Sequence, residues 1–286
     1  MKLEKISQIK DGRQDGAIYN GFLFSFNHRG VCSVYELSAL ENGKSDVFAE
    51  FVLDRNDELV PHSNSVTFGN EFYDENDEFP LLYTNIYNNY CSNEDKLTGV
   101  CLVYRLQRSG KEFKTNLVQM IEIGFTEDTS LWKSEGENSD LRPYGNFVVD
   151  TKKSILYAFT MRDNTHTTRY FAFNLPKANE GIMCEKYKVK KVILNECDIL
   201  EHFDLDYHYF MQGACYNDGK IYSTEGFTDN DQRPPAIRIV DLELKKEICF
   251  KLFKELGSNV EPELIDFENG TCYYVDHFGN VYKLLF

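Results

Sequence analysis

Polar side chains that can bind or titrate recur at the start of five short apolar segments. Each segment begins with an acid or an amide and continues into small or β-branched apolar residues, as in "DGAIYNG", "QGACYN" and "ELIDFENG". The five starting residues are Asp15, Asn64, Asn146, Gln212 and Glu263. Carboxylates transfer protons and bind cations, whereas amides supply directional hydrogen-bond donors and acceptors. If the segments are copies of one repeat, these side chains form a polar ring.

Further polar residues lie close to this ring in the sequence. We expect ligand binding by His62, Asn64, Arg142, Tyr144, Asn146, Gln212 and Glu263, and we take Asp15, Glu225, Glu261 and Glu263 as catalytic candidates. Asp15 with Glu261 or Glu263 would supply the acid and base that glycoside hydrolysis needs. The alternative is structural, because amides also satisfy buried polar groups where strands converge.

The five segments open a longer repeat of strand-like patterns. The second patterns are "FLFSFN", "LLYTNIY", "ILYAFTMR", "KIYSTEG" and "TCYYVD", and the third are "CSVYEL", "CLVYRL", "YFAFNL", "IRIVDL" and "NVYKLL". Tyr35, Tyr104 and Phe173 are evenly spaced in the third patterns, since 104 − 35 and 173 − 104 both equal 69. We expect fourth strands at "DVFAEFVL", "NLVQMIEIGF", "KVKKVILN" and "EICFKLFK". Recurrence of this kind is typical of propellers.

The fifth copy lacks a fourth strand, and the N-terminal "KLEKISQIK" alternates like one. We therefore predict an all-β protein, a five-bladed β-propeller whose last blade is closed by the N-terminal strand. One domain would span 1–286, with blades near 11–55, 60–125, 142–196, 208–256, and 260–286 plus 1–10. The polar insertion at 196–210 is expected to carry a helical turn at "ILEHFDL". A β-sandwich with an appended β-domain is the alternative, but it does not explain five copies.

Composition limits the partners. The formal net charge is −15, from 46 acidic and 31 basic residues, so nucleic acid would be repelled. No apolar stretch approaches the roughly 20 residues of a membrane span, and the N-terminus lacks the apolar region of a signal peptide. We expect a cytoplasmic protein that binds a small polar molecule or a peptide, with no nucleic acid or membrane partner. Its eight cysteines contain no CxxC pair and are expected to be buried thiols.

Metal and cofactor motifs are absent from the sequence. The acidic loops at 74–78 and 229–232 do not fit an EF-hand, and no P-loop, GxGxxG, GxSxG or HExxH motif occurs. We expect no metal ligand set and no cofactor, although a bound divalent cation stays open.

One hairpin resembles a blade of the five-bladed glutaminyl cyclases of plant and bacterial type. The matching residues are Phe210, Gln212, Gly213, Gly219, Tyr222 and Gly226. The resemblance covers about 45 residues and implies a propeller fold. The family places its catalytic acid directly after the tyrosine, where this chain has Ser223, with Glu225 two residues further on. The family's site is lined by tryptophans, whereas this chain has only Trp132, so the resemblance implies a shared architecture more than a shared reaction.

Three functions follow from these observations. The first is binding of a small polar ligand, sugar- or peptide-like, at the mouth of the propeller channel. The second is a hydrolase or cyclotransferase that uses carboxylates around the axis. The third is a protein-interaction scaffold that uses the acidic loops.

Overall fold

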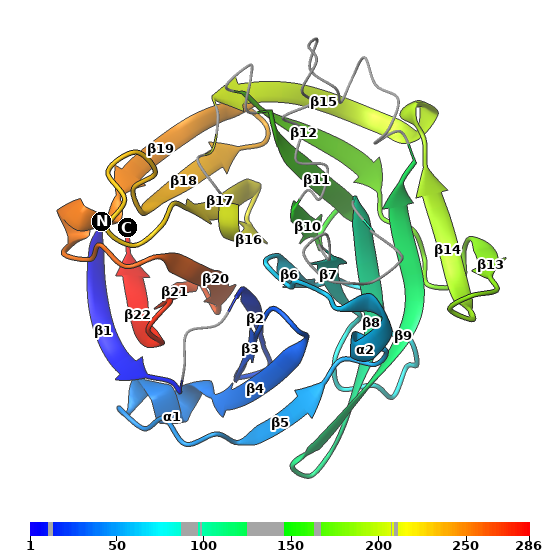
Figure 1. Cartoon of the computed structure of the whole chain (residues 1–286), viewed down its shortest axis with the longest axis horizontal. Helices are drawn as coiled ribbons and strands as arrows, with labels where there is room; N and C mark the ends of the chain where they lie inside the picture. Colours follow the sequence, from blue (N-terminus) through cyan, green and yellow to red (C-terminus); the bar gives the residue numbers. More distant parts are fainter. Residues whose placement is uncertain are drawn as a thin grey trace.

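Five β-sheets surround a central axis in the computed structural model of the chain (Figure 1). The structure describes residues 1–10, 14–86, 97, 99–124, 146–162, 167–206, 208 and 211–286. Each sheet is one blade, and its first strand lies nearest the axis. The predicted all-β, five-bladed β-propeller is therefore confirmed. That the whole chain forms a single domain stays a prediction.

The blades follow the order of the sequence. Blade 1 comprises β2 (Gly16–Tyr19), β3 (Phe22–Phe26), β4 (Val31–Glu36) and β5 (Ala49–Val52). Blade 2 comprises β6 (Val66–Phe68), β7 (Leu82–Ile86), β8 (Val100–Ser109) and β9 (Glu112–Ile123), extended by β14 (Val189–Leu194) and β13 (Ile182–Cys184). Blade 3 comprises β10 (Asn146–Asp150), β11 (Ile155–Arg162), β12 (Thr167–Asn174) and β15 (Ile199–Asp206). Blade 4 comprises β16 (Met211–Asn217), β17 (Lys220–Glu225), β18 (Ala236–Asp241) and β19 (Lys246–Leu252). Blade 5 comprises β20 (Pro262–Glu268), β21 (Thr271–Asp276), β22 (Asn280–Leu285) and β1 (Lys2–Gln8).

Short helices occur between strands of the described chain. They are α1 (Leu37–Glu41), α2 (Asn56–Leu59) and two 3-10 helices, Glu196–Asp198 and Phe253–Leu256. None of the helices in these ranges is long and apolar enough to cross a bilayer.

Tight turns join the first and second strands of three blades. Asn20-Gly21, Asp218-Gly219 and Asn269-Gly270 all have positive φ at both residues. Two consecutive positive φ angles favour the hairpin turn that matches the twist of antiparallel strands, and Asn-Gly or Asp-Gly adopts it readily. These dipeptides therefore fix the register of the inner hairpins, as in the pairing of Asn217 with Lys220.

The outer part of blade 3 differs from the sequence-based prediction. The segment "KVKKVILN" does not supply its fourth strand, because β14 pairs in parallel with β9 of blade 2. The fourth strand is β15, which pairs antiparallel with β12, so the predicted helical turn at "ILEHFDL" is wrong. The inward side of β15 carries Ile199, Phe203 and Leu205, and this alternation with more exposed residues suits a strand covered on one face.

The N-terminal strand closes the ring. β1 pairs antiparallel with β22, from Lys2 opposite Leu285 to Gln8 opposite Asn280. The two ends of the chain meet at this blade (Figure 1). The prediction that the last blade takes its outer strand from the N-terminus is confirmed.

Apolar side chains pack between neighbouring blades. Between blades 1 and 2, Phe24 contacts Phe68 and Phe79 at ring centroid distances of 5.4 and 5.6 Å. Similar clusters fill the other four interfaces. Of the described cysteines, Cys32, Cys101, Cys215 and Cys272 are buried free thiols, as expected, whereas Cys184 and Cys249 are partly exposed and Cys197 is exposed. Because each interface buries its own cluster, the inner strands are held firmly around the axis.

Candidate functional site

The inner strands all begin at the same end of the channel, which we call the mouth. Backbone hydrogen bonds link these beginnings, as where Asp15 N–H donates to the Ser63 carbonyl at 3.1 Å. The second strands of the blades end there too, since Met211 pairs with Glu225 and Pro262 with Asp276. The mouth therefore gathers side chains from first-strand starts and second-strand ends.

Asp15 lies inside the channel below the mouth, and its carboxylate reaches across the axis. Oδ2 accepts hydrogen bonds from Val66 N at 2.9 Å in blade 2 and from Ala214 N at 3.4 Å in blade 4. The side chain is fully buried, and burial raises its pKa well above the usual value, opposed by these backbone donors. Asp15 thus joins three blades. This placement favours the structural interpretation for the residue.

Four residues form a compact group at the mouth, which we call the mouth cluster: Gln212 of blade 4 with Glu261, Glu263 and His277 of blade 5. Gln212 Nε2 donates to Glu261 Oε1 at 2.6 Å and to the Gly226 carbonyl at 3.2 Å. His277 Nδ1 lies 2.8 Å from Glu263 Oε1. Backbone His277 N–H also donates to the Glu261 carbonyl at 2.8 Å. The start of β16 in blade 4 is therefore held beside the start of β20 and the end of β21 in blade 5.

The members of the mouth cluster differ in exposure to solvent. The His277 side chain is 48% exposed, whereas Glu263 beneath it is 1% exposed. Burial raises the pKa of Glu263 to about 8, and the hydrogen bond with Glu263 raises the pKa of His277. Burial also raises the pKa of Glu261. Burial therefore disfavours the charged forms of Glu263 and Glu261 at the mouth.

The amides of blades 2 and 3 occupy the other side of the mouth. Asn85 Nδ2 donates to Asn64 Oδ1, and Asn146 Nδ2 donates to the Asn64 carbonyl at 3.4 Å. His62 is two residues before Asn64 in the sequence and is half-buried, and desolvation lowers the pKa of His62 to about 4. Arg142 and Tyr144 fall outside the described residues. The predicted binding residues of the described chain thus divide into an amide half and an acidic half.

Glu225 does not join them. It is fully buried between blades 3 and 4, where its Oε1 lies 3.2 Å from Nη2 of Arg238. Ser223 points the same way, and its Oγ lies 3.2 Å from Nε2 of His208, which is itself fully buried. The environment is that of a polar core packed between blades.

Sequence reasoning missed His277. The only available signal was its position one residue beyond the second strand of the fifth repeat, next to Asp276. Its ring and the two glutamates each offer one ligand atom, and these atoms lie within 4.8 Å of one another. Glu261, Glu263 and His277 are the residues of the described chain that could hold a metal ion.

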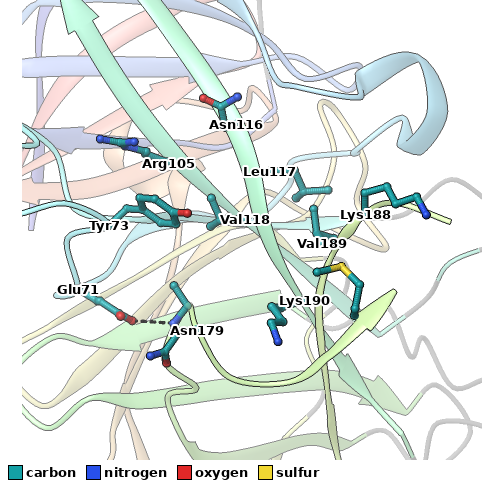
Figure 2. Close-up of a pocket in the computed structure, with 12 residues that line it drawn as sticks. Glu71, Tyr73, Arg105, Asn116, Leu117, Val118, Asn179, Lys188, Val189 and Lys190 are labelled. Atoms are coloured by element: carbon teal, nitrogen blue, oxygen red, sulfur yellow. Dashed lines mark hydrogen bonds between the residues drawn. The ribbon is translucent and has the colours of Figure 1, made fainter. Parts of the chain in front are cut away.

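A second hollow lies at the outer edge of blade 2, where β13 and β14 pass β9 (Figure 2). Its volume is about 730 Å³. Most of its charged groups already have partners: Arg105 pairs with Asp77 at 2.7 Å, and Lys188 pairs with Glu185 at 2.5 Å. Glu71 accepts from Ala178 N at 3.1 Å. None of the predicted site residues that the structure describes lines this hollow.

Comparison with solved structures supports the fold. The chain is similar to Myxococcus xanthus glutaminyl cyclase with a TM-score of 0.50 and 8% identity over 98% of this chain and 97% of that one. A catalytically inactive virginiamycin B lyase from Staphylococcus aureus, solved with quinupristin, has a TM-score of 0.46 and 10% identity over 100% and 99% of the two chains. No family model and no curated protein matches the sequence. At 8% identity, the likeness to the glutaminyl cyclase shows the propeller fold alone.

The hairpin that carries the sequence resemblance is β16 with β17. Gln212 and Gly213 open its first strand, and Tyr222 packs on Phe267 of blade 5 at a centroid distance of 4.7 Å. Phe210 lies outside the described residues. The matching residues thus support the blade and its contact with blade 5, and Gln212 is the one that reaches the mouth cluster.

Proposed function

We propose that this protein binds a small polar ligand, sugar- or peptide-like, at the channel mouth. The observation that carries the proposal is the link between Gln212 and Glu261, which joins blades 4 and 5 beside a carboxylate that is itself buried. Convergent polar groups from several elements are typical of small-molecule sites.

The charge of the mouth indicates which part of a ligand would bind. Glu261 and Glu263 have no Lys or Arg ion-pair partner among the described residues. Carboxylates accept hydrogen bonds and attract cations, so a ligand that presents hydroxyl groups or an amino end is favoured. The hollow at blade 2 is less suited to such a ligand, because most of its charged groups are already paired.

A thermal-shift screen of the full chain in EDTA tests the proposal. The compounds are monosaccharides, amino acids and short peptides with free amino ends. A ligand at 100 times its Kd stabilises the folded state by about 2.7 kcal/mol, and we expect Tm to rise by roughly 5 °C. Mass analysis of each hit after incubation would reveal the alternative, a hydrolase or cyclotransferase.

Paired variants locate the binding site. Gln212→Ala should weaken the hit at least tenfold, because it removes the donor that orients Glu261. Asn179→Ala is the control, since this exposed amide lines the blade 2 hollow instead. A hit that survives Gln212→Ala and is lost in Asn179→Ala would contradict binding at the mouth.

A further inference from the structure

Two carboxylates and an imidazole converge at the mouth, and no Lys or Arg of the described chain forms an ion pair with either carboxylate. Glu261 directly precedes β20, Glu263 is its second residue, and His277 follows β21. One ligand atom from each lies within 4.8 Å of the other two. We propose that Glu261, Glu263 and His277 bind one divalent transition-metal ion.

Glu263 provides the second observation that points to a ligand. Its side chain is 1% exposed, and its Oε2 has no hydrogen-bond partner among the described residues. A buried carboxylate oxygen without a donor is costly, and a cation is one of the few groups that compensates for it. The other oxygen of the same carboxylate already faces His277 at 2.8 Å. An ion between these residues would satisfy Glu263.

The local charge balance also favours a cation. Within the described chain, His277 is the one ion-pair partner of Glu263, and Glu261 has none. Asp276 adds a further buried carboxylate nearby, but its Oδ1 accepts from Phe278 N at 3.0 Å and its Oδ2 accepts from Asn280 Nδ2 at 2.8 Å. Three acidic groups thus surround a single imidazole.

Gln212 plays the part of an orienting group. Its Nε2 donates to Glu261 Oε1 and is itself anchored on the Gly226 carbonyl. Carboxylates that bind metals are commonly held in this way by a neighbouring hydrogen bond. The half-exposed side of His277 leaves a path for the ion and for water to reach the site.

The donor set selects the class of metal. Carboxylates suit Mg²⁺, Ca²⁺ and Mn²⁺, whereas an imidazole suits Zn²⁺ and Fe²⁺, so the mixed donor set favours a first-row transition ion such as Mn²⁺ or Zn²⁺ over Mg²⁺ and Ca²⁺. Three protein ligands leave coordination positions for water or for a ligand oxygen. The inference concerns the same mouth as the proposed function and deepens it, because such an ion would bind the polar groups of a small ligand.

Mn²⁺ alone is the probe that tests the metal site. EDTA-treated and dialysed full-length protein is titrated with Mn²⁺, and the free ion is followed by electron paramagnetic resonance. We expect one ion per chain. Glu263→Gln and His277→Asn should each weaken binding at least tenfold, and His277 is exposed enough for its variant to fold.

His202→Asn is the control, because it removes an exposed histidine on β15 and should leave Mn²⁺ binding unchanged. The absence of a saturable site would overturn the proposal, as would unchanged affinity in both test variants. Displacement of Mn²⁺ by equimolar Mg²⁺ would contradict an imidazole ligand. Since no organic ligand is present, failure here is separate from failure of the screen in EDTA.

Discussion

Residues that share a position in the repeat do not share an environment. Asp15 and Glu263 both open an inner strand, yet Asp15 accepts backbone hydrogen bonds inside the channel and Glu263 faces His277 at the mouth. The repeat predicted the strand position of each side chain. The hydrogen-bond partners of a side chain depend on neighbouring blades, and the sequence pattern of one blade contains no information about those partners.

His62 provides a test at the residue scale. Its pKa is about 4 in the folded protein and about 6.5 in the unfolded chain. Between pH 6.5 and pH 4, His62 is therefore protonated in the unfolded chain and neutral in the folded protein. Stability should fall between pH 6.5 and pH 4 by up to about 3 kcal/mol from this residue.

Urea unfolding of wild type and His62→Gln at pH 7 and pH 4.5 measures this contribution. The variant should lose less stability on acidification than the wild type. His202→Gln is the control, because it removes an exposed histidine on β15 of blade 3. Equal losses in wild type and His62→Gln would show that His62 is protonated alike in both states.

Strand alternation explains why Glu225 lies apart from the mouth cluster. Its position at the end of β17 was read correctly from the sequence, and that end does lie at the mouth. However, successive side chains point to opposite faces of a strand. Ser223 and Glu225 both point into the interface of blades 3 and 4. Glu225 therefore lies at the level of the mouth, but its side chain points away from the channel.

At the scale of elements, the inner strands approach one another closely at Gly213. A Cβ built on this residue would lie 2.0 Å from the Glu263 carbonyl oxygen and 2.9 Å from Asp15 Oδ1. The first contact is with backbone and cannot be relieved by a rotamer change. Gly213→Ala should therefore destabilise the protein by about 3 kcal/mol, the upper end for an overpacked core.

Gly219→Ala is the matched control for that prediction. Nothing lies within 4 Å of its Cβ position, so only its positive φ is unfavourable, by about 1 kcal/mol. The comparison is made by urea denaturation. If the two variants were equally stable, the close approach of β16 and β20 would not limit the packing of blades 4 and 5.

The exchange between β14 and β15 marks the limit of prediction from strand patterns. Both segments alternate, and both follow β12, so either could have been its partner. Tertiary contacts decide the outcome, since β14 joins β9 in parallel and Gly124 N donates to the Leu194 carbonyl at 2.8 Å. Pairing across blades leaves no periodic signal in one sequence.

At the scale of the whole molecule, the number of blades and the closing strand were predictable because they follow from counting repeats. The side chains of the acidic half of the mouth were predictable except His277, which lies beyond the end of a repeat strand. The metal-ligand geometry was not, because it joins two strand ends that the sequence separates by 14 residues, from Glu263 to His277.

Removal of residues 1–8 tests the closing strand. The truncated chain would expose the edge of β22, which pairs with β1 at six positions. Exposed edges promote association, so we expect a lower Tm and a loss of monomer in size-exclusion chromatography. Lys5→Ala is the control, because it removes only the exposed hydrogen bond to Asn280 and should change stability by less than about 0.5 kcal/mol. A truncated chain that stays monomeric with unchanged Tm would contradict a closing role.

The pairing of Lys2 with Leu285 also describes the topology of the molecule. In blade 4 a covalent turn leads from the third strand to the fourth, whereas in blade 5 the same junction is the gap between the two termini. The protein is thus a cyclic meander cut at one hairpin. A short peptide across that gap would make the backbone circular, and the present numbering is one of several linear orders, related by circular permutation, in which the same five blades can be written.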